Sequence, residues 1–127
     1  MASSLKELMA EARAAVPAIH PVEAAALMAT GDPLVVDVRD IMELRASGKI
    51  PGAVHVSRGL LEFKAAPDSP MHDPAFRKDR TVLVYCASGG RSALAGKTLK
   101  DFGFKDVRNL GGFQDWMAAG GKAEKVG

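Results

Sequence analysis

The sequence contains a single cysteine, Cys86, and has no large excess of charge of either sign among its 127 residues. One cysteine cannot form an internal disulfide, so a disulfide framework is excluded and a reducing compartment is expected. The formal net charge is only +2, and no block of lysine or arginine stands out. Nucleic acid and anionic membrane surfaces are therefore not expected as partners.

Long apolar runs are also missing. No stretch approaches the roughly 20 apolar residues that a membrane span needs, and the first residues lack the basic and apolar regions of a signal peptide. Together these absences lead us to expect a cytoplasmic protein without membrane contact. The three histidines, His20, His55 and His72, do not have the spacing of metal ligands, so no metal site is expected.

Length and composition predict one globular domain over residues 1–127, with 47% hydrophobic and 25% charged residues. An N-terminal helix is expected within residues 1–16, because Ser4 followed by Glu7 matches a capping box. The glycine- and lysine-rich tail, residues 121–127, is expected to be mobile.

Short apolar runs alternate with helical patterns along the rest of the chain. The predicted strands are residues 18–20, 34–38, 54–56, 81–85 and 107–110. The predicted helices are residues 22–30, 40–45, 57–65, 92–102 and 113–119. Because no hairpin turns join the strands, the pattern predicts an α/β fold. Its central, mainly parallel sheet has about five strands and helices on both faces.

Cys86 follows directly after the apolar run that predicts a strand at residues 81–85, and a helical pattern begins a few residues later. In open α/β sheets, sites form beyond the carboxyl ends of the strands. A thiol at that place faces unpaired backbone N–H groups and the positive end of a helix dipole. That environment favours the thiolate, which is the reactive form of cysteine.

The residues after Cys86 support a reactive rather than a structural thiol. Gly89 and Gly90 allow the backbone to curl so that successive N–H groups point inward, which suits an anion. Ala87 and Ser88 are too small to block such a loop. Arg91 adds a permanent positive charge. The alternative is a small buried hydrophobic residue, the commonest role of a lone cysteine.

Four short motifs follow one another along the chain, and they are VDVRD (36–40), GKIPGAVH (48–55), YCASGGRS (85–92) and LGGFQDW (110–116). With these motifs in this order, the chain resembles the rhodanese-like family of single-domain sulfurtransferases over nearly its whole length. The resemblance implies a rhodanese-like α/β fold with an active loop built around Cys86. It also implies transfer of sulfane sulfur from a donor such as thiosulfate, through a persulfide on Cys86, to a nucleophilic acceptor.

In this interpretation Cys86 is catalytic, and no metal or organic cofactor is needed. The expected partners are a small sulfane-sulfur donor, a thiophilic acceptor and, as a further option, a sulfur-relay protein. The residues expected to bind substrate are Ala87, Ser88, Gly89, Gly90, Arg91, Ser92 and Arg58. Thiosulfate-using members of the family carry extra basic residues in the loop, where this chain has Ala87 and Ser88, so the donor stays open.

Two alternatives remain. The first is a rhodanese-like binding module without catalysis, although an intact cysteine and an unobstructed glycine loop favour the enzyme. The second is a phosphatase or an arsenate reductase. In the related families, sulfurtransferases carry six loop residues and the phosphatases and reductases carry seven. The six residues from Cys86 to Arg91 therefore favour sulfur over phosphate.

Several other residues allow two interpretations. Asp37 and Arg39 are expected to form a buried or half-buried ion pair with hydrogen bonds to nearby loops, in a network that includes Glu43. The alternative is an Arg39 directed at the active site. Arg58 either attracts an anionic donor or is an exposed arginine at a helix start. Ser92 is expected to cap the following helix and to donate its hydroxyl to Cys86.

Two residues outside the loop are given structural roles. His55 is expected to be a hydrogen-bonded structural residue, and Trp116 to pack in the core. Gly52, Gly111 and Gly112 are expected to be turn glycines that need a positive φ or allow close backbone approach.

Overall fold

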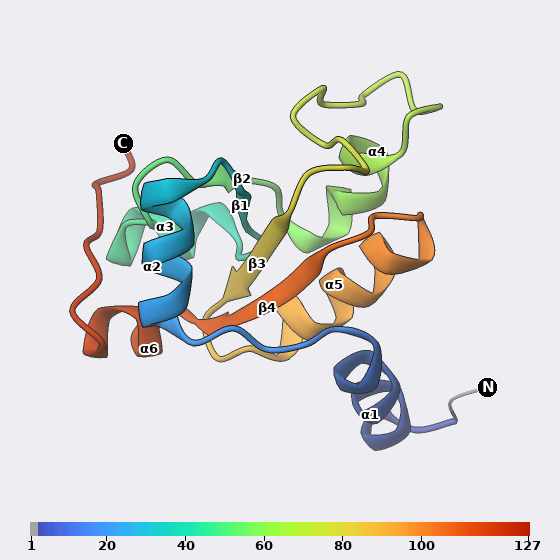
Figure 1. Ribbon diagram of the computed structural model, residues 1–127, viewed down its shortest axis with the longest axis horizontal. Helices are drawn as coiled ribbons and strands as arrows, with labels where there is room; N and C mark the ends of the chain where they lie inside the picture. The colour runs from blue at the N-terminus through green and yellow to red at the C-terminus, as the bar shows by residue number, and fades with distance from the viewer. Residues whose placement is uncertain (1–2) are drawn as a thin grey trace.

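A computed structural model describes residues 3–127 and shows a parallel sheet between two layers of helices (Figure 1). The strands are β1 (Leu34–Asp37), β2 (Val54–His55), β3 (Val82–Cys86) and β4 (Val107–Gly112). The helices are α1 (Leu5–Ala15), α2 (Pro21–Thr30), α3 (Ile41–Ser47), the 3₁₀ turn η1 (Arg58–Leu60), α4 (Leu61–Ala65), α5 (Gly90–Asp101) and α6 (Phe113–Ala118).

The sheet formed by residues 3–127 has four strands in the order β2-β1-β3-β4, and all neighbouring strands are parallel. The α/β class and the parallel sheet are as predicted, with four strands rather than about five. The predicted strand at residues 18–20 is a single bridge between Ala18 and Asn109. Prolines at positions 17 and 21 flank this segment and lack an N–H, so a longer ladder cannot form.

Helices cover both faces of the sheet. Figure 1 shows α4 and α5 on one side and α2, α3 and α6 on the other, and α1 packs against α5. Along β3, Val82, Val84 and Cys86 pack into the core on the α5 side, whereas Leu83 and Tyr85 pack into the core below α2 and α6. Burial on both faces explains why the strand is apolar throughout and does not alternate with polar residues.

The N-terminal helix begins where its capping residue predicts. Ser4 is the N-cap of α1, and its hydroxyl accepts a hydrogen bond from the backbone N–H of Glu7 at 3.1 Å. The expected helix at residues 57–65 is divided into η1 and α4. No helix within residues 3–127 combines the length and the apolar character that crossing a bilayer requires.

The C-terminal tail, which the sequence predicts to be mobile, contacts the rest of the domain at two places. The backbone of Glu124 pairs with that of Lys49 in both directions, with N···O distances of 2.8 and 3.0 Å, and the two side chains form an ion pair. The carbonyl of Lys122 accepts a hydrogen bond from Nε1 of Trp116 at 2.8 Å. Trp116 is buried, as predicted, so the tail lies across a fixed part of the core.

Candidate active site

Cys86 is the last residue of β3, and α5 begins four residues later at Gly90. The chain between them turns around the sulfur. Gly89 is the N-cap of α5 with φ of +101°, a left-handed conformation that costs glycine little. Its backbone N–H donates to Cys86 Sγ at 3.0 Å, and the Ser92 hydroxyl lies 3.4 Å from the same sulfur. The loop therefore presents donors to the sulfur.

The environment of Cys86 stabilises the thiolate although only 1% of the residue is exposed. Burial by itself raises the pKa of the thiol. Hydrogen bonds from the Ser92 hydroxyl and from the backbone N–H groups of Ser92, Gly89 and Ser88 lower it, and together they outweigh burial. The pKa of Cys86 is therefore below its ordinary value. This distinguishes the residue from a thiol enclosed by hydrocarbon, whose pKa is raised.

Arg91 is paired with Glu43 from α3. Two hydrogen bonds of 2.7 and 2.9 Å join the guanidinium to the carboxylate, and both side chains are partly exposed. The hydrogen bond from Arg91 is the main reason that the pKa of Glu43 falls to about 2. Glu43 belongs to the Asp37–Arg39 network as expected, because its backbone carbonyl accepts a hydrogen bond at 2.9 Å from the Ser47 hydroxyl that Arg39 also contacts. Its carboxylate lies between Arg91 and the backbone N–H of Asp40, which donates at 2.9 Å.

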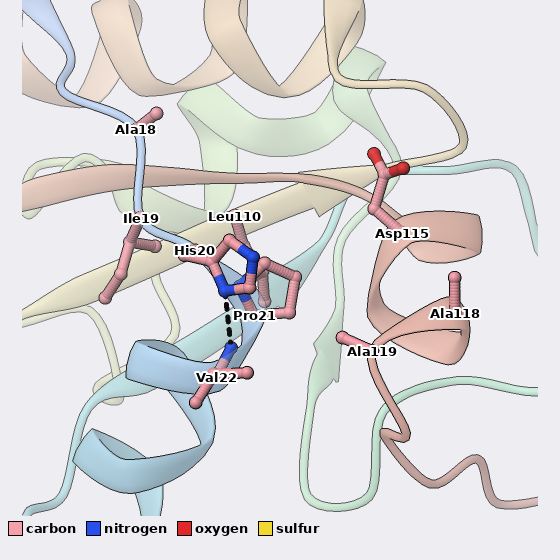
Figure 2. A pocket seen from close by; sticks show the side chains of 9 residues that line it. All are labelled: Ala18, Ile19, His20, Pro21, Val22, Leu110, Asp115, Ala118 and Ala119. Carbon is pink, nitrogen blue, oxygen red and sulfur yellow. Dashed lines mark hydrogen bonds between the residues drawn. The ribbon is translucent and has the colours of Figure 1, made fainter.

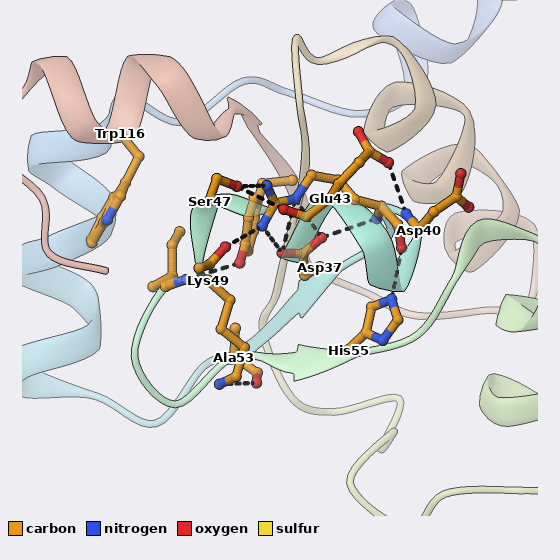
Figure 3. A network of polar contacts seen from close by, with 12 residues as sticks. Asp37, Asp40, Glu43, Ser47, Lys49, Ala53, His55 and Trp116 are labelled. Atoms are coloured by element: carbon orange, nitrogen blue, oxygen red, sulfur yellow. Dashed lines mark hydrogen bonds and ion pairs between the residues drawn. The ribbon is translucent and has the colours of Figure 1, made fainter. Parts of the chain in front are cut away.

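Arg39 forms the predicted buried ion pair with Asp37 and is not directed at the sulfur. Its guanidinium contacts Asp37 Oδ2 at 2.7 Å and donates to the Gly48 carbonyl at 2.7 Å and to Ser47 Oγ at 2.8 Å (Figure 3). It also lies over the ring of Phe113, with 4.5 Å between Arg39 Cζ and the ring centroid. With Arg39 only 2% exposed, this network holds β1, α3 and the following turn together.

His55 has the structural role expected of it. Its Nε2 lies 2.7 Å from the Arg39 carbonyl oxygen, so it belongs to the network around Arg39 rather than to the cysteine loop.

The Arg58 side chain lies along the side of α5. It donates to Glu62 Oε1 and to Thr98 Oγ1, each at 3.0 Å. Thr98 lies two turns beyond the start of α5, so this conformation does not bring Arg58 to Cys86.

Ser92 contacts the sulfur but does not cap α5. It is the third residue of the helix, after the N-cap Gly89, and its hydroxyl donates to Asn109 Oδ1 at 2.7 Å. Asn109 is a residue that reasoning from sequence missed. It is the only asparagine in the chain and lies in β4, two residues after the core residue Val107. The signal in the sequence was a polar residue at a strand position that faces the helix layer, where an apolar residue is expected.

The end of β4 packs directly against the cysteine loop through two glycines. Gly111 has φ of +90°, and a Cβ placed on Gly112 would lie 2.5 Å from the Ala87 carbonyl oxygen. Both expectations, a positive φ and close approach, are confirmed, as is the positive φ of +82° at Gly52. The register of β4 against β3 shifts by one residue just before Gly111, as in a β-bulge, which directs the strand end toward the loop.

A large hollow of the surface lies elsewhere and contains none of the predicted site residues. It has a volume of about 730 Å³ and lies between the start of α2 and α6 (Figure 2). Most of its lining is apolar. His20 at its edge is a capping residue, whose Nδ1 accepts a hydrogen bond from the N–H of Val22 at 3.1 Å. Within residues 3–127 no group of three or more His, Cys, Asp or Glu side chains is placed to hold a metal ion.

Comparison with known proteins gives one family. The model of the Rhodanese-like domain matches residues 20–119. A sulfurtransferase of Allochromatium vinosum is 37% identical over 92 residues, which are 72% of this chain and 78% of that protein. The thiosulfate sulfurtransferase GlpE of Coxiella burnetii is 34% identical over 79% of this chain and 86% of that protein.

Other relatives are longer. The chain spans 16% of the length of a tRNA sulfurtransferase of Desulfurococcus amylolyticus, which is 32% identical over 88 residues, or 69% of this chain. It spans 43% of the length of a relative from Bacillus subtilis. In these proteins the matching part is one portion of a larger chain.

Two solved structures extend the comparison. A protein of unknown function from Rhodopseudomonas palustris, described as a possible tyrosine phosphatase, is 40% identical, with a TM-score of 0.90 over 98% of this chain and 96% of the other. The polysulfide-sulfur transferase homodimer of Wolinella succinogenes is 32% identical, with a TM-score of 0.73 over 95% of this chain and 87% of the other.

Proposed function

Because the chain belongs to the rhodanese-like domain family, we propose that it is a sulfurtransferase that carries sulfane sulfur as a persulfide on Cys86. The observation that carries this proposal is the position of the sulfur, between the Gly89 N–H at 3.0 Å and the Ser92 hydroxyl at 3.4 Å, at the start of α5. Backbone donors that are already oriented stabilise anionic sulfur without rearranging during the reaction.

Two displacements complete the transfer. The Cys86 thiolate attacks the outer sulfur of a donor and forms a new S–S bond. The bond to the donor breaks, and its electron pair leaves with the donor fragment, which is sulfite when the donor is thiosulfate. An acceptor nucleophile then attacks the terminal sulfur of the persulfide and releases the Cys86 thiolate. This order predicts ping-pong kinetics, and neither step needs a metal or an organic cofactor.

The pairing of the arginines near the site indicates which sulfur donors can bind. Each of the three arginines considered for this role is paired with a carboxylate: Arg91 with Glu43, Arg58 with Glu62 and Arg39 with Asp37. Doubly charged thiosulfate therefore meets no unpaired guanidinium among these three. We expect a singly charged organic persulfide to be the better donor, presented as a small molecule or on a protein.

A relay partner is a natural acceptor in this proposal. The tRNA sulfurtransferase relative contains the matching region as a small part of its length, which supports passage of sulfur from such a domain to another site. We therefore include a second protein among the candidate acceptors.

Phosphate chemistry is the alternative to be tested, since one solved relative is described as a possible tyrosine phosphatase. The six residues from Cys86 to Arg91 form a small loop, and Arg91 is held by Glu43. A guanidinium that is already neutralised contributes little to binding a phosphate dianion. Both features favour the smaller sulfur anion.

Intact-mass measurement tests the proposal directly. The protein is incubated separately with thiosulfate and with inorganic polysulfide, using Cys86→Ser as the control. A gain of one sulfur atom that cyanide removes, and that the variant lacks, is expected. No adduct with either donor would overturn the proposal in favour of a binding module. Hydrolysis of an aryl phosphate that depends on Cys86 would instead favour a phosphatase.

A further inference from the structure

Asn109 joins three parts of the candidate site through one side chain. Its Oδ1 accepts hydrogen bonds from the Ser92 hydroxyl at 2.7 Å and from the Gly111 N–H at 2.9 Å. Its Nδ2 donates to the Gly89 carbonyl at 3.3 Å. These contacts connect β4 with the loop after β3 and with the first turn of α5.

The two loop residues that Asn109 holds are those in contact with the sulfur. The Gly89 N–H donates to Cys86 Sγ, and the Ser92 hydroxyl lies beside it. The Gly89 carbonyl also accepts a helix hydrogen bond from the Ala93 N–H at 3.2 Å, so Asn109 adds a second contact at the residue whose N–H faces the sulfur. Without Asn109, the Ser92 side chain could adopt another rotamer.

Ser92 has a single hydroxyl proton, and both Asn109 Oδ1 and the Cys86 sulfur can accept it. When Cys86 is a thiol, the hydroxyl donates to Asn109 Oδ1, 2.7 Å away. When Cys86 is a thiolate, the same hydroxyl can turn its proton to the sulfur, while Asn109 Oδ1 keeps the hydrogen bond from Gly111. Asn109 thus places the Ser92 hydroxyl beside the thiol, from where it can donate to the sulfur as the negative charge forms.

We propose that Asn109 is a positioning residue of the sulfur site, which holds the Ser92 hydroxyl and the backbone at Gly89 in place beside Cys86. This inference rests on the proposed function, because it concerns how the same loop stabilises anionic sulfur. Asn109 does not touch the sulfur itself and acts through its two neighbours.

The backbone of Asn109 has a separate structural role that a side-chain substitution leaves intact. Its N–H donates to the Pro17 carbonyl at 2.8 Å, and its carbonyl accepts from the Ile19 N–H at 3.0 Å. The side chain is only half-buried. Asn109→Ala removes the amide, and Asn109→Asp replaces its donor by a negative charge of nearly the same shape.

The thiolate itself provides the readout. Cys86 is the only cysteine, so ultraviolet thiolate absorbance as a function of pH reports this residue alone. The only tyrosine, Tyr85, does not interfere, because burial raises its pKa far above the range measured. We expect the midpoint to rise by about one pH unit in Asn109→Ala and further in Asn109→Asp.

Matched variants separate positioning from general damage to the fold. Gln114→Glu adds the same charge on the exposed side of α6 and is expected to leave the midpoint unchanged. In a Ser92→Ala background the shift caused by Asn109→Asp is expected to shrink, because one of the two groups that Asn109 holds is gone. Sulfur uptake by Asn109→Asp is expected to fall about tenfold at pH 6 and to recover at pH 10.

The inference is overturned if Asn109→Ala leaves the midpoint unchanged, because the negative charge of Asn109→Asp by itself raises the pKa of a nearby thiol. It is equally overturned if uptake by Asn109→Asp stays low at every pH, because a damaged fold would act in that way. The titration needs no sulfur donor. If wild-type protein takes up no sulfur while the Asn109 variants still shift the midpoint, the proposed function fails and the positioning role stands.

Discussion

The carboxyl ends of β1 and β3 lie side by side in the sheet, and each carries a buried group that can be charged. At the end of β1, Asp37 forms an ion pair with Arg39, two residues further along the chain. The Arg39 guanidinium also donates hydrogen bonds to Ser47 and Gly48. At the end of β3, the groups that contact Cys86 are backbone N–H groups and one hydroxyl. The charge of Asp37 is met by a full opposite charge in direct contact, whereas the groups in contact with the Cys86 sulfur are dipoles.

The difference explains why one site is suited to structure and the other to chemistry. In the Asp37–Arg39 pair each guanidinium nitrogen has a hydrogen-bond partner, so the pair stabilises the fold and is not available to a substrate. Removing one partner leaves a buried charge uncompensated. A thiolate held by dipoles keeps its lone pairs and its nucleophilicity. The same dipoles can accept a second sulfur in place of the first. The following predictions test this division of roles.

The largest expected effect is on sulfur uptake in Cys86→Ser. Uptake from polysulfide should fall below detection, because the serine hydroxyl remains protonated and cannot form a persulfide. The free energy of unfolding should change by no more than about 1 kcal/mol, since serine can accept the Gly89 N–H. Intact mass and urea denaturation measure the two quantities on the same sample. Residual uptake would place the reactive group elsewhere.

The next effect concerns stability in Arg39→Met. We expect the free energy of unfolding to fall by about 3–5 kcal/mol, because Asp37 is left buried and unpaired. Arg108→Met, which breaks the partly exposed pair with Asp106, is the matched control and should cost less than about 1 kcal/mol. Equal losses in urea denaturation would contradict the structural role of the buried pair.

A smaller effect is expected on the choice of donor in Glu43→Gln. The change frees Arg91 beside the cysteine loop, so the KM for thiosulfate should fall by about fivefold, equivalent to about 1 kcal/mol. Uptake from a singly charged persulfide should change less. Glu62→Gln frees Arg58 on the side of α5 and is the control. If both variants lower the KM alike, Arg58 also reaches the donor.

The smallest expected effect is the change with pH in the free energy of unfolding that the Glu43–Arg91 pair contributes. The folded-state pKa of Glu43 is about 2, below the value of 4.5 for an unperturbed glutamate. The pair therefore stabilises the protein fully above about pH 4.5, and this contribution is lost as the pH falls toward 2. Because the pair is partly exposed, it should be worth less than about 1 kcal/mol.

Urea denaturation of wild type and Glu43→Gln at several pH values measures this contribution. The two curves should converge as the pH falls from about 4.5 to 2 and run parallel above that range. A constant difference across the whole range would mean that the carboxylate charge of Glu43 does not contribute to stability.

Local patterns were sufficient to predict most elements of the fold. The apolar run at β3, the capping residue Ser4 and the glycines at positions 52, 111 and 112 each act through neighbours in sequence, so the chain alone revealed them. The placement of Cys86 between a strand and a helix is of the same kind.

Contacts between distant residues could not be predicted in this way. Glu43 and Arg91 are 48 positions apart, and nothing in their neighbourhoods distinguishes this pairing from one with Arg39. The contact of Asn109 with Ser92 joins β4 to α5 across 17 positions. The pairing of Glu124 with Lys49 joins residues 75 positions apart.

The close approach of Gly112 to Ala87 has a consequence for biosynthesis. The segment that completes the sulfur loop is translated more than twenty positions after Cys86, as part of the last strand. A nascent chain that has not yet reached Val107 lacks both this contact and Asn109, so we expect its thiol to be less acidic than in the complete sheet. The nucleophile and the residues that hold its loop thus come together only when the last strand joins the sheet.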